Sequence, residues 1–273
     1  MPEVFTYSFM HRAFIVGNMI AIVTPLIGVF LILKRLSLIG HTLSHVALAG
    51  IALALLIGVY PIPVAIIVSI IAALGIEKLR EDYSDYAELS LSIILAAGLG
   101  IATILISMSK NSAGIMSYLF GSITLITVSD FYTVIPLSIG IILVIMINFY
   151  GFFYLAFNEK DARLAGVPVK LLNTLFMILI AITVSLSMRI VGGLLIASLI
   201  SLPVASSLQL ANSFKQTVIY SIIIALISVN AGLITSFYMD LAPGGTIILT
   251  NVICLLLIVS YNALKRRIKW KKN

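Results

Sequence analysis

Long apolar runs, separated by short charged or proline- and glycine-rich breaks, limit how this chain can fold more than any other feature. A helix that spans a bilayer needs about 20 predominantly apolar residues, and runs of this kind follow one another along the whole sequence. Of the 273 residues, 61% are hydrophobic and 10% are charged, whereas a soluble domain carries about a quarter charged residues. We therefore expect an all-α polytopic membrane protein with one transmembrane domain over residues 1–273.

The breaks predict about nine membrane spans, with eight as the alternative count. The expected spans are 13–33, 36–59, 64–76, 89–108, 131–153, 171–188, 191–210, 218–237 and 247–264. The third is short and ends before the charged residues 77–82. The weakly polar segment 110–124 is expected to form an interfacial or re-entrant helix. No Asp or Glu falls inside an expected span, because Glu88 and Asp130 lie at span ends.

The basic residues predict the orientation. With nine spans and the N-terminus outside, the inner loops and the C-terminal tail hold 14 of the 17 Lys and Arg residues, as the positive-inside rule requires; eight spans would break this agreement at one end. Only Arg12, Lys110 and Arg189 fall outside. We expect a multi-pass protein of the plasma (inner) membrane with a cytoplasmic C-terminus. The net charge of +7 then indicates contact with membrane lipid headgroups and not with nucleic acid.

Two histidines stand inside the second expected span. His41 and His45 are four residues apart, so on a helix both imidazoles lie on one face. Ionisable groups at membrane depth are costly and indicate function, and neutral imidazole is a favoured zinc ligand. The alternative is that the pair only satisfies itself, Ser44 or backbone groups. Thr42 stands where H-E-x-x-H proteases have glutamate, which disfavours a membrane protease.

Small residues follow the pair along the same span. They would allow another helix, or a second copy of this one, to approach closely. They are Ala47, Ala49, Gly50, Ala52 and Ala54.

Other motifs restrict the source of energy. The chain has no G-x-x-x-x-G-K-[ST] phosphate-binding loop, and the absence of acidic residues at depth disfavours ion-coupled transport. Any uphill transport would then be driven by another chain. The polar loop 157–170 predicts a short amphipathic helix ended by Gly166 and Pro168. This loop is either an ordinary solvated loop or a docking helix for a cytoplasmic partner. Cys254 is the single cysteine, which excludes disulfides within the chain.

Several stretches together resemble the permease subunits of ABC importers for zinc, manganese and iron. The resemblance covers nearly the whole chain in the right order. It lies in Leu36–Leu53 with L-S-L-x-G-x-x-L-S-H, Phe120–Ile123 with F-G-x-I, Ala162–Leu172 with A-x-x-x-G-x-P-V, Val191–Leu195 with V-G-x-L-L, Leu202–Ala205 with L-P-x-A, and Asp240–Ile247 with D-x-x-x-G-x-T-I.

The resemblance implies a type II ABC importer-like fold and an ATP-driven metal importer in which this chain is a transport subunit and not an enzyme. Two permease copies, expected as a homodimer, would form the pathway, and an extracellular metal-binding lipoprotein or periplasmic protein would deliver the cation. Two cytoplasmic ATPases would use the ATP and dock on segment 157–172. The docking residues it implies are Glu159, Asp161, Ala162, Arg163, Gly166 and Pro168.

The family's cation-passage residues map onto His41 and His45, and no other cofactor is implied for this chain. The sequence departs from the family pattern at three places: His41 replaces an aspartate, Ala49 replaces a proline, and Ser90–Ser92 replaces Ala-Ile-Gly. Four imidazoles from two copies would suit tetrahedral zinc better than manganese, which prefers oxygen ligands. Two other classes stay open: an ABC permease for a chelate such as a siderophore or cobalamin, and a small intramembrane metalloenzyme.

Overall fold

The structure is a computed structural model that describes residues 7–83, 87–109 and 112–270. Its secondary structure is helical, in agreement with the all-α expectation. The helices of the described residues are α1 (Ser8–Leu33), α2 (Ser37–Ile57), α3 (Pro61–Asp82), α4 (Ala87–Met108), α5 (Ser112–Phe120), α6 (Val128–Ile147), α7 (Phe149–Phe157), α8 (Glu159–Leu164), α9 (Val169–Ser187), α10 (Ile196–Leu208), α11 (Phe214–Met239) and α12 (Pro243–Trp270).

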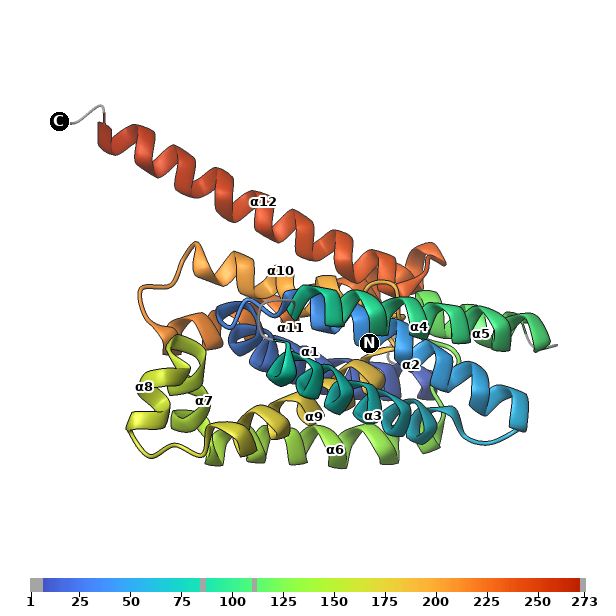
Figure 1. Cartoon of the computed structure of the whole chain (residues 1–273). Coiled ribbons are helices and arrows are strands. Elements are labelled where there is room, and N and C mark those ends of the chain that lie inside the picture. The colour runs from blue at the N-terminus through green and yellow to red at the C-terminus, as the bar shows by residue number, and fades with distance from the viewer. Residues whose placement is uncertain (1–6, 84–86, 110–111, 271–273) are drawn as a thin grey trace.

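Most of the long helices run side by side along one axis (Figure 1). The short helices α7 and α8 lie at one end of this bundle, which we call the α8 end. Helix α5 lies toward the opposite end, which we call the α5 end. Helix α12 leaves the bundle at an angle, so its C-terminal half projects away from the other helices.

Eight of the described helices are long and apolar enough to cross a membrane, which agrees with the alternative count of spans. The seventh expected span, 191–210, contains only the 13-residue helix α10. A helix of this length reaches about 20 Å, less than the roughly 30 Å of a hydrocarbon core. Residues 188–195 form a turn instead, in which Gly192 has a φ of +84°.

Two expected boundaries were wrong. Helix α3 does not stop before the charged residues but continues to Asp82, because Glu, Lys, Leu and Arg are all good helix formers. Glu77 is therefore inside a helix that can span the membrane, and it is 7% exposed, against the expectation of no acidic residue inside a span. The expected span 131–153 breaks at Asn148, which separates α6 from α7.

Local sequence signals explain several helix ends. Pro61 occupies the first turn of α3, where a missing N–H costs nothing, and Gly58 ends α2 in the left-handed conformation with a φ of +75°. Thr127 and Asp130 form a capping box at the start of α6. The segment 110–124, expected to form an interfacial or re-entrant helix, contains α5. Lys110, Asn111 and the last basic residues of the tail, Lys271 and Lys272, lie outside the described residues.

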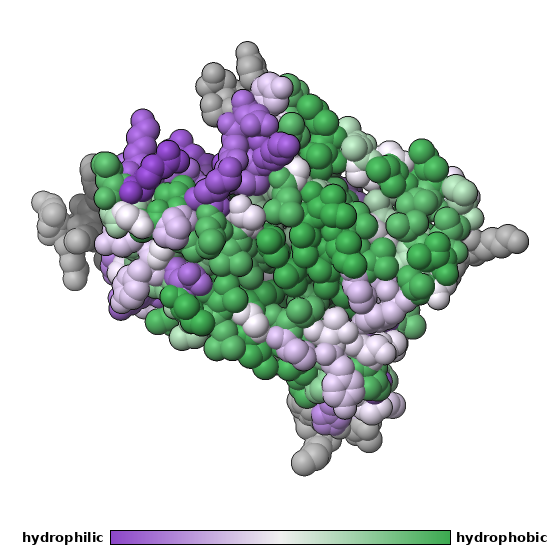
Figure 2. Space-filling view, turned by 60° about the horizontal axis from the view of Figure 1, so that its bottom comes forward, coloured by the Kyte–Doolittle hydropathy of each residue, from purple (hydrophilic) through white to green (hydrophobic). Residues whose placement is uncertain are grey.

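Helices α1 and α2 are the most deeply buried spans, and α12 and α4 the least. Figure 2 shows hydrophobic residues over the middle of one face, with the most hydrophilic ones gathered toward an edge. Such an outer surface is suited to lipid, since lipid tails are as apolar as these side chains. The histidine-bearing helix is therefore held inside the bundle.

Candidate metal site and the loops around it

His41 and His45 lie on one face of α2, as their spacing predicts. Their ring centroids are 4.7 Å apart, and the ring planes are at 89° to one another. Both side chains are partly exposed, whereas the three residues between them are buried. His41 lies four residues after the start of α2, about 6 Å along its axis. The two imidazoles are thus directed toward one open side of the helix.

Ser44, one of the partners considered for the pair, bonds the backbone instead. The Ser44 hydroxyl donates to the backbone carbonyl of His41 at 2.7 Å and so does not hold either imidazole. In the described part of the chain, no three His, Cys, Asp or Glu side chains are grouped closely enough to hold a metal ion. At this place, one chain therefore presents two imidazole side chains on one face of α2.

The small residues after the pair are used within the same chain. All of them are buried, and α2 packs mainly against α3 and α4. A Cβ atom on Gly50 would come within 2.8 Å of the Ala65 Cα on α3. On α4, a Cβ atom on Gly98 would come within 2.8 Å of a Val46 methyl group. The small residues were predicted to allow another helix to approach closely, and this prediction is confirmed for α3 and α4.

Backbone segments meet beside the histidine helix at a place we call the glycine junction (Gly121, Gly192, Gly193 and Gly244). The amide of Gly193 donates to the carbonyl of Tyr118 at 2.8 Å, and Gly121 has a φ of +80°. A Cβ atom on Gly193 would lie 3.9 Å from the carbonyl oxygen of Ser44, the residue before His45. The end of α5 and the α9–α10 turn therefore pack together against α2.

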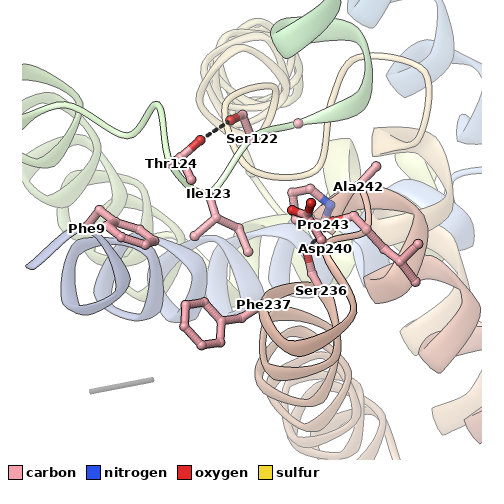
Figure 3. A pocket seen from close by; sticks show the side chains of 11 residues that line it. Phe9, Ser122, Ile123, Thr124, Ser236, Phe237, Asp240, Ala242 and Pro243 are labelled. Atoms are coloured by element: carbon pink, nitrogen blue, oxygen red, sulfur yellow. Dashed lines mark hydrogen bonds between the residues drawn. The ribbon is translucent and has the colours of Figure 1, made fainter. Parts of the chain in front are cut away.

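A cavity of about 360 Å³ opens next to this junction, between α1, the α5–α6 loop and the α11–α12 turn (Figure 3). Asp240 lines it in a left-handed backbone conformation, with a φ of +51°. Ser122 and Thr124 contribute hydroxyls that are 3.3 Å apart, and the rings of Phe9 and Phe237 line one side. This lining gives the cavity a single carboxylate.

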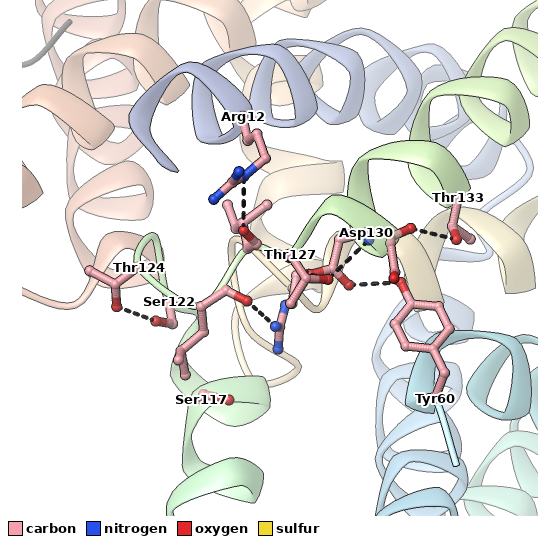
Figure 4. Close-up of polar contacts among 12 residues, drawn as sticks. Arg12, Tyr60, Ser117, Ser122, Thr124, Thr127, Asp130 and Thr133 are labelled. Carbon is pink, nitrogen blue, oxygen red and sulfur yellow. Dashed lines mark hydrogen bonds and ion pairs between the residues drawn. The ribbon is translucent and has the colours of Figure 1, made fainter. Parts of the chain in front are cut away.

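A buried polar network surrounds Asp130, which has no exposed surface. The Arg189 Nε donates to Asp130 Oδ2 at 2.9 Å, and the Tyr60 hydroxyl donates to Oδ1 at 2.8 Å (Figure 4). The backbone amide of Thr127 donates to Oδ2 at 2.7 Å, and Arg189 also donates to the carbonyl of Leu125. Burial, and then the hydrogen bond to Asp130, raise the pKa of Tyr60.

Two further side chains extend the network. Arg12 on α1 donates to the carbonyl of Ile126 at 3.2 Å, and the Arg189 guanidinium lies 4.8 Å from the ring centroid of Tyr118 on α5. Charged and aromatic groups from α1, α5, α6 and two interhelix turns thus connect the elements at the α5 end. Sequence reasoning did not pair these residues. The available signal was the presence of Asp130 and Arg189 beside apolar spans, where ionisable groups are rarely unpaired.

The predicted amphipathic helix is present as α8. Asn158 caps it by accepting from the amide of Lys160 at 2.9 Å, and Gly166 follows it with a φ of +78°. Ala162 is fully buried, whereas Leu164 is 88% exposed. Ala162, one of the residues implied for docking, therefore packs α8 onto the bundle and does not face a partner. The exposed residues of α8 and its flanks include Glu159, Lys160, Asp161, Arg163, Leu164, Gly166 and Pro168.

Glu159 joins α8 to the bundle. Its carboxylate lies 3.0 Å from the Lys34 ammonium and accepts from the Asn173 amide at 3.2 Å. Partial burial by itself raises the pKa of Glu159, but the bond to Lys34 and its charge outweigh this, so the pKa is below its ordinary value.

Comparison with known proteins identifies the family. The model of the ABC 3 transport family matches residues 6–262. The chain belongs to this family. It is 34% identical to a probable metal transport system membrane protein of Treponema pallidum, over 95% of this chain and 98% of the relative. It is 29% identical to a high-affinity zinc uptake system membrane protein of Haemophilus influenzae, over 90% and 94% of the two chains. Other relatives are named for manganese import and for chelated-iron transport.

A solved structure shares the fold. The structure of PsaBC from Streptococcus pneumoniae in complex with Fab superposes with a TM-score of 0.83 at 28% identity, covering 92% of this chain and 91% of that one. The chain is therefore a membrane permease of a metal ABC importer and not itself an enzyme. Three of its family-like motifs, 120–123, 191–195 and 240–247, meet at the glycine junction beside the histidine helix, and motif 162–172 begins in α8.

Proposed function

We propose that this permease carries zinc, and that the transported ion passes a transient site made by His41 and His45 of two copies of the chain. The observation that carries the proposal is the contact of the two imidazoles, whose ring centroids are 4.7 Å apart on the open side of α2. Tetrahedral zinc takes four nitrogen or sulfur ligands. Two copies supply four imidazoles, which is a poor ligand set for manganese because manganese favours oxygen.

The energy comes from partner chains in this proposal. Two ATPases dock on segment 157–172 at the predicted cytoplasmic face, and an extracellular binding protein delivers the cation at the opposite face. The exposed side of α8 supports the docking: Leu164 is 88% exposed beside the charged Arg163. A partner that covered Leu164 would bury an apolar side chain at the centre of the contact and leave the charged residues around it at the polar rim.

Uptake by the reconstituted importer tests the cargo and the site together. The permease, its ATPase and its binding protein are placed in proteoliposomes, and the entry of zinc and of manganese is measured with ATP. His45→Ala is expected to reduce zinc uptake by more than about tenfold, since it removes a direct ligand. His41→Asp replaces a nitrogen ligand by oxygen and is expected to shift the preference from zinc toward manganese.

His11→Ala is the matched control, because it removes an exposed imidazole from α1 and leaves the pair intact. It is expected to transport zinc at the unaltered rate. An unchanged zinc preference in His41→Asp would contradict the assignment of zinc. Normal uptake by His45→Ala would make the pair structural, and uptake of the metal only as a chelate would make the chain a chelate permease.

A further inference from the structure

A closed ring of polar contacts links α8 to the turn that leads into the histidine helix. Lys34 directly follows α1, and its side chain is 8% exposed. Its ammonium donates to Glu159 Oε1 at 3.0 Å and to Asn173 Oδ1 at 2.5 Å. The Asn173 amide donates to the same Glu159 oxygen at 3.2 Å. We call these three residues the Lys34 triad; they join the end of α1, the start of α8 and the first turns of α9.

Charges on α3 surround the triad. Glu77 and Arg80 form an ion pair at 3.0 Å, with side chains that are 9% and 22% exposed. Glu77 is within electrostatic range of both Lys34 and Glu159, and Arg80 is within range of Glu159. Lys34 is thus a nearly buried cation, which distinguishes it from the lysines of exposed surface pairs that contribute little.

The turn after Lys34 connects it to the metal site within seven residues. Arg35 has a φ of +57°, a left-handed conformation that residues with side chains adopt rarely. The amide of Leu36 donates to the carbonyl of Leu31 at 2.9 Å and closes the turn. Helix α2 begins at Ser37 and carries His41 in its second turn. A tightly bonded turn of this kind transmits a displacement of α1 to α2 instead of absorbing it.

Apolar contacts hold the end of α1 in addition to the contacts of Lys34, whose ammonium lies 6.0 Å from the ring centroid of Phe176. The ring of Phe30, one turn earlier, contacts the rings of Phe152, Phe176 and Phe214 with centroids 5.4–6.4 Å apart. This aromatic cluster fixes the end of α1 against α7, α9 and α11. Removal of the Lys34 charge therefore leaves the apolar contacts of α1 in place.

We propose that Lys34 is a positioning residue that couples α8 to the metal site: a displacement of α8 by an ATPase passes through Glu159 and Lys34 to the α1–α2 turn and moves His41 and His45. The proposal rests on the proposed function, in which the ATPases dock on α8. Metal–ligand distances tolerate changes of only about 0.2 Å. Even a small displacement of α2 would therefore change the affinity of the site for the cation.

The number of metal ions transported for each ATP hydrolysed tests this role. The importer with its ATPases and binding protein is reconstituted in proteoliposomes, and zinc entry and ATP hydrolysis are measured on the same samples. Lys34→Met keeps the aliphatic stem but removes the charge. We expect the ATPase to bind and to hydrolyse ATP as before, while the zinc-to-ATP ratio falls at least about tenfold, since a misplacement of about 1 Å can cost about a hundredfold.

Two variants separate coupling from structure. Lys34→Arg keeps a cation at this position without changing the docking surface of α8, and it is expected to keep most of the ratio that Lys34→Met loses. Lys215→Met removes an exposed lysine at the start of α11 and is expected to leave the ratio unchanged. An unchanged ratio in Lys34→Met would overturn the proposal, and so would a parallel loss of ATPase binding, hydrolysis and transport, which indicates a structural role.

The docking step is tested separately with Leu164→Asp, which places a charge at the exposed tip of α8. If ATPase binding to this variant is unaltered, docking on α8 is wrong and the coupling proposal falls with it. If binding is lost in Leu164→Asp but the ratio is unaltered in Lys34→Met, docking stands and only the role of Lys34 is overturned.

Discussion

Arg189 Nε lies 2.9 Å from Asp130 Oδ2, in an ion pair whose side chains are 8% and 0% exposed. The two residues are 59 positions apart in the sequence. The pair joins the α9–α10 turn to the start of α6, close to the glycine junction that packs against the histidine helix. Loss of one partner would leave the other charge buried and uncompensated.

Arg189→Met is therefore expected to lower the free energy of unfolding by about 3–5 kcal/mol. Chemical unfolding in detergent measures this loss. The control is Lys170→Met, which breaks an exposed ion pair with Glu81 and should cost less than about 1 kcal/mol. Equal losses in the two variants would mean that the Asp130 network contributes no more than a surface pair.

Tyr60→Phe removes the hydroxyl that donates to Asp130 Oδ1 at 2.8 Å and leaves the ring in place. A hydrogen bond to a charged group contributes about 1.5–3 kcal/mol, so we expect a loss of stability in this range. The same change at Tyr132, which is 71% exposed, is the matched control and should have no measurable effect. Thermal unfolding of both variants and of the unaltered protein measures these two effects, and an equal effect in the two variants would contradict the expectation.

Gly192→Ala introduces a side chain where the backbone has a φ of +84° and where a Cβ atom would overlap the carbonyl oxygen of Leu119. We expect a loss of at least about 2 kcal/mol, because left-handed strain and overpacking add. Gly245→Ala, at a position with open space around it, should be tolerated. The yield of monodisperse protein and its thermal stability measure the difference, and equal behaviour would contradict close backbone packing at the junction.

The pKa of Glu159 predicts a pH dependence at α8. Burial alone would raise the pKa, but Lys34 and Asn173 bring it below its ordinary value of 4.5. Because the pKa of Glu159 is lowered in the folded protein, ionised Glu159 stabilises the contact of α8 with the bundle at pH values above 4.5. This stabilisation is lost as the pH falls through the lowered pKa. Hydrogen exchange of α8 should accelerate over that acidic range. Glu159→Gln should exchange faster at neutral pH and show no such acceleration, whereas an identical pH profile would exclude Glu159 as its cause.

Hydropathy alone predicted the class of the protein and most of its spans, because each span is a local run of apolar residues. The prediction from hydropathy failed where a helix continues beyond the end of its apolar run. Helix α3 continues through Glu77 to Asp82, since helical hydrogen bonding does not depend on side-chain polarity. Hydropathy also merged α6 with α7, although Asn148 separates them.

At the candidate site, too, contacts within one helix were predictable and contacts between helices were not. The pairing of His41 with His45 follows from helical periodicity and was predictable. The pairing of Asp130 with Arg189, or of Lys34 with Glu159, depends on which helices are neighbours, and neither spacing nor composition contains that information. The sequence signal was only that these ionisable residues stand beside apolar spans, where an unpaired charge would be costly.

The central claim is that His41 and His45 of two chains bind one cation between them. Its most direct test is the amount of zinc bound by the purified permease in nanodiscs, measured by calorimetry and by metal analysis. We expect one zinc for every two chains, and no such binding in His45→Ala, while His11→Ala binds as the unaltered protein does. One zinc for each single chain, or unaltered binding by His45→Ala, would contradict the claim.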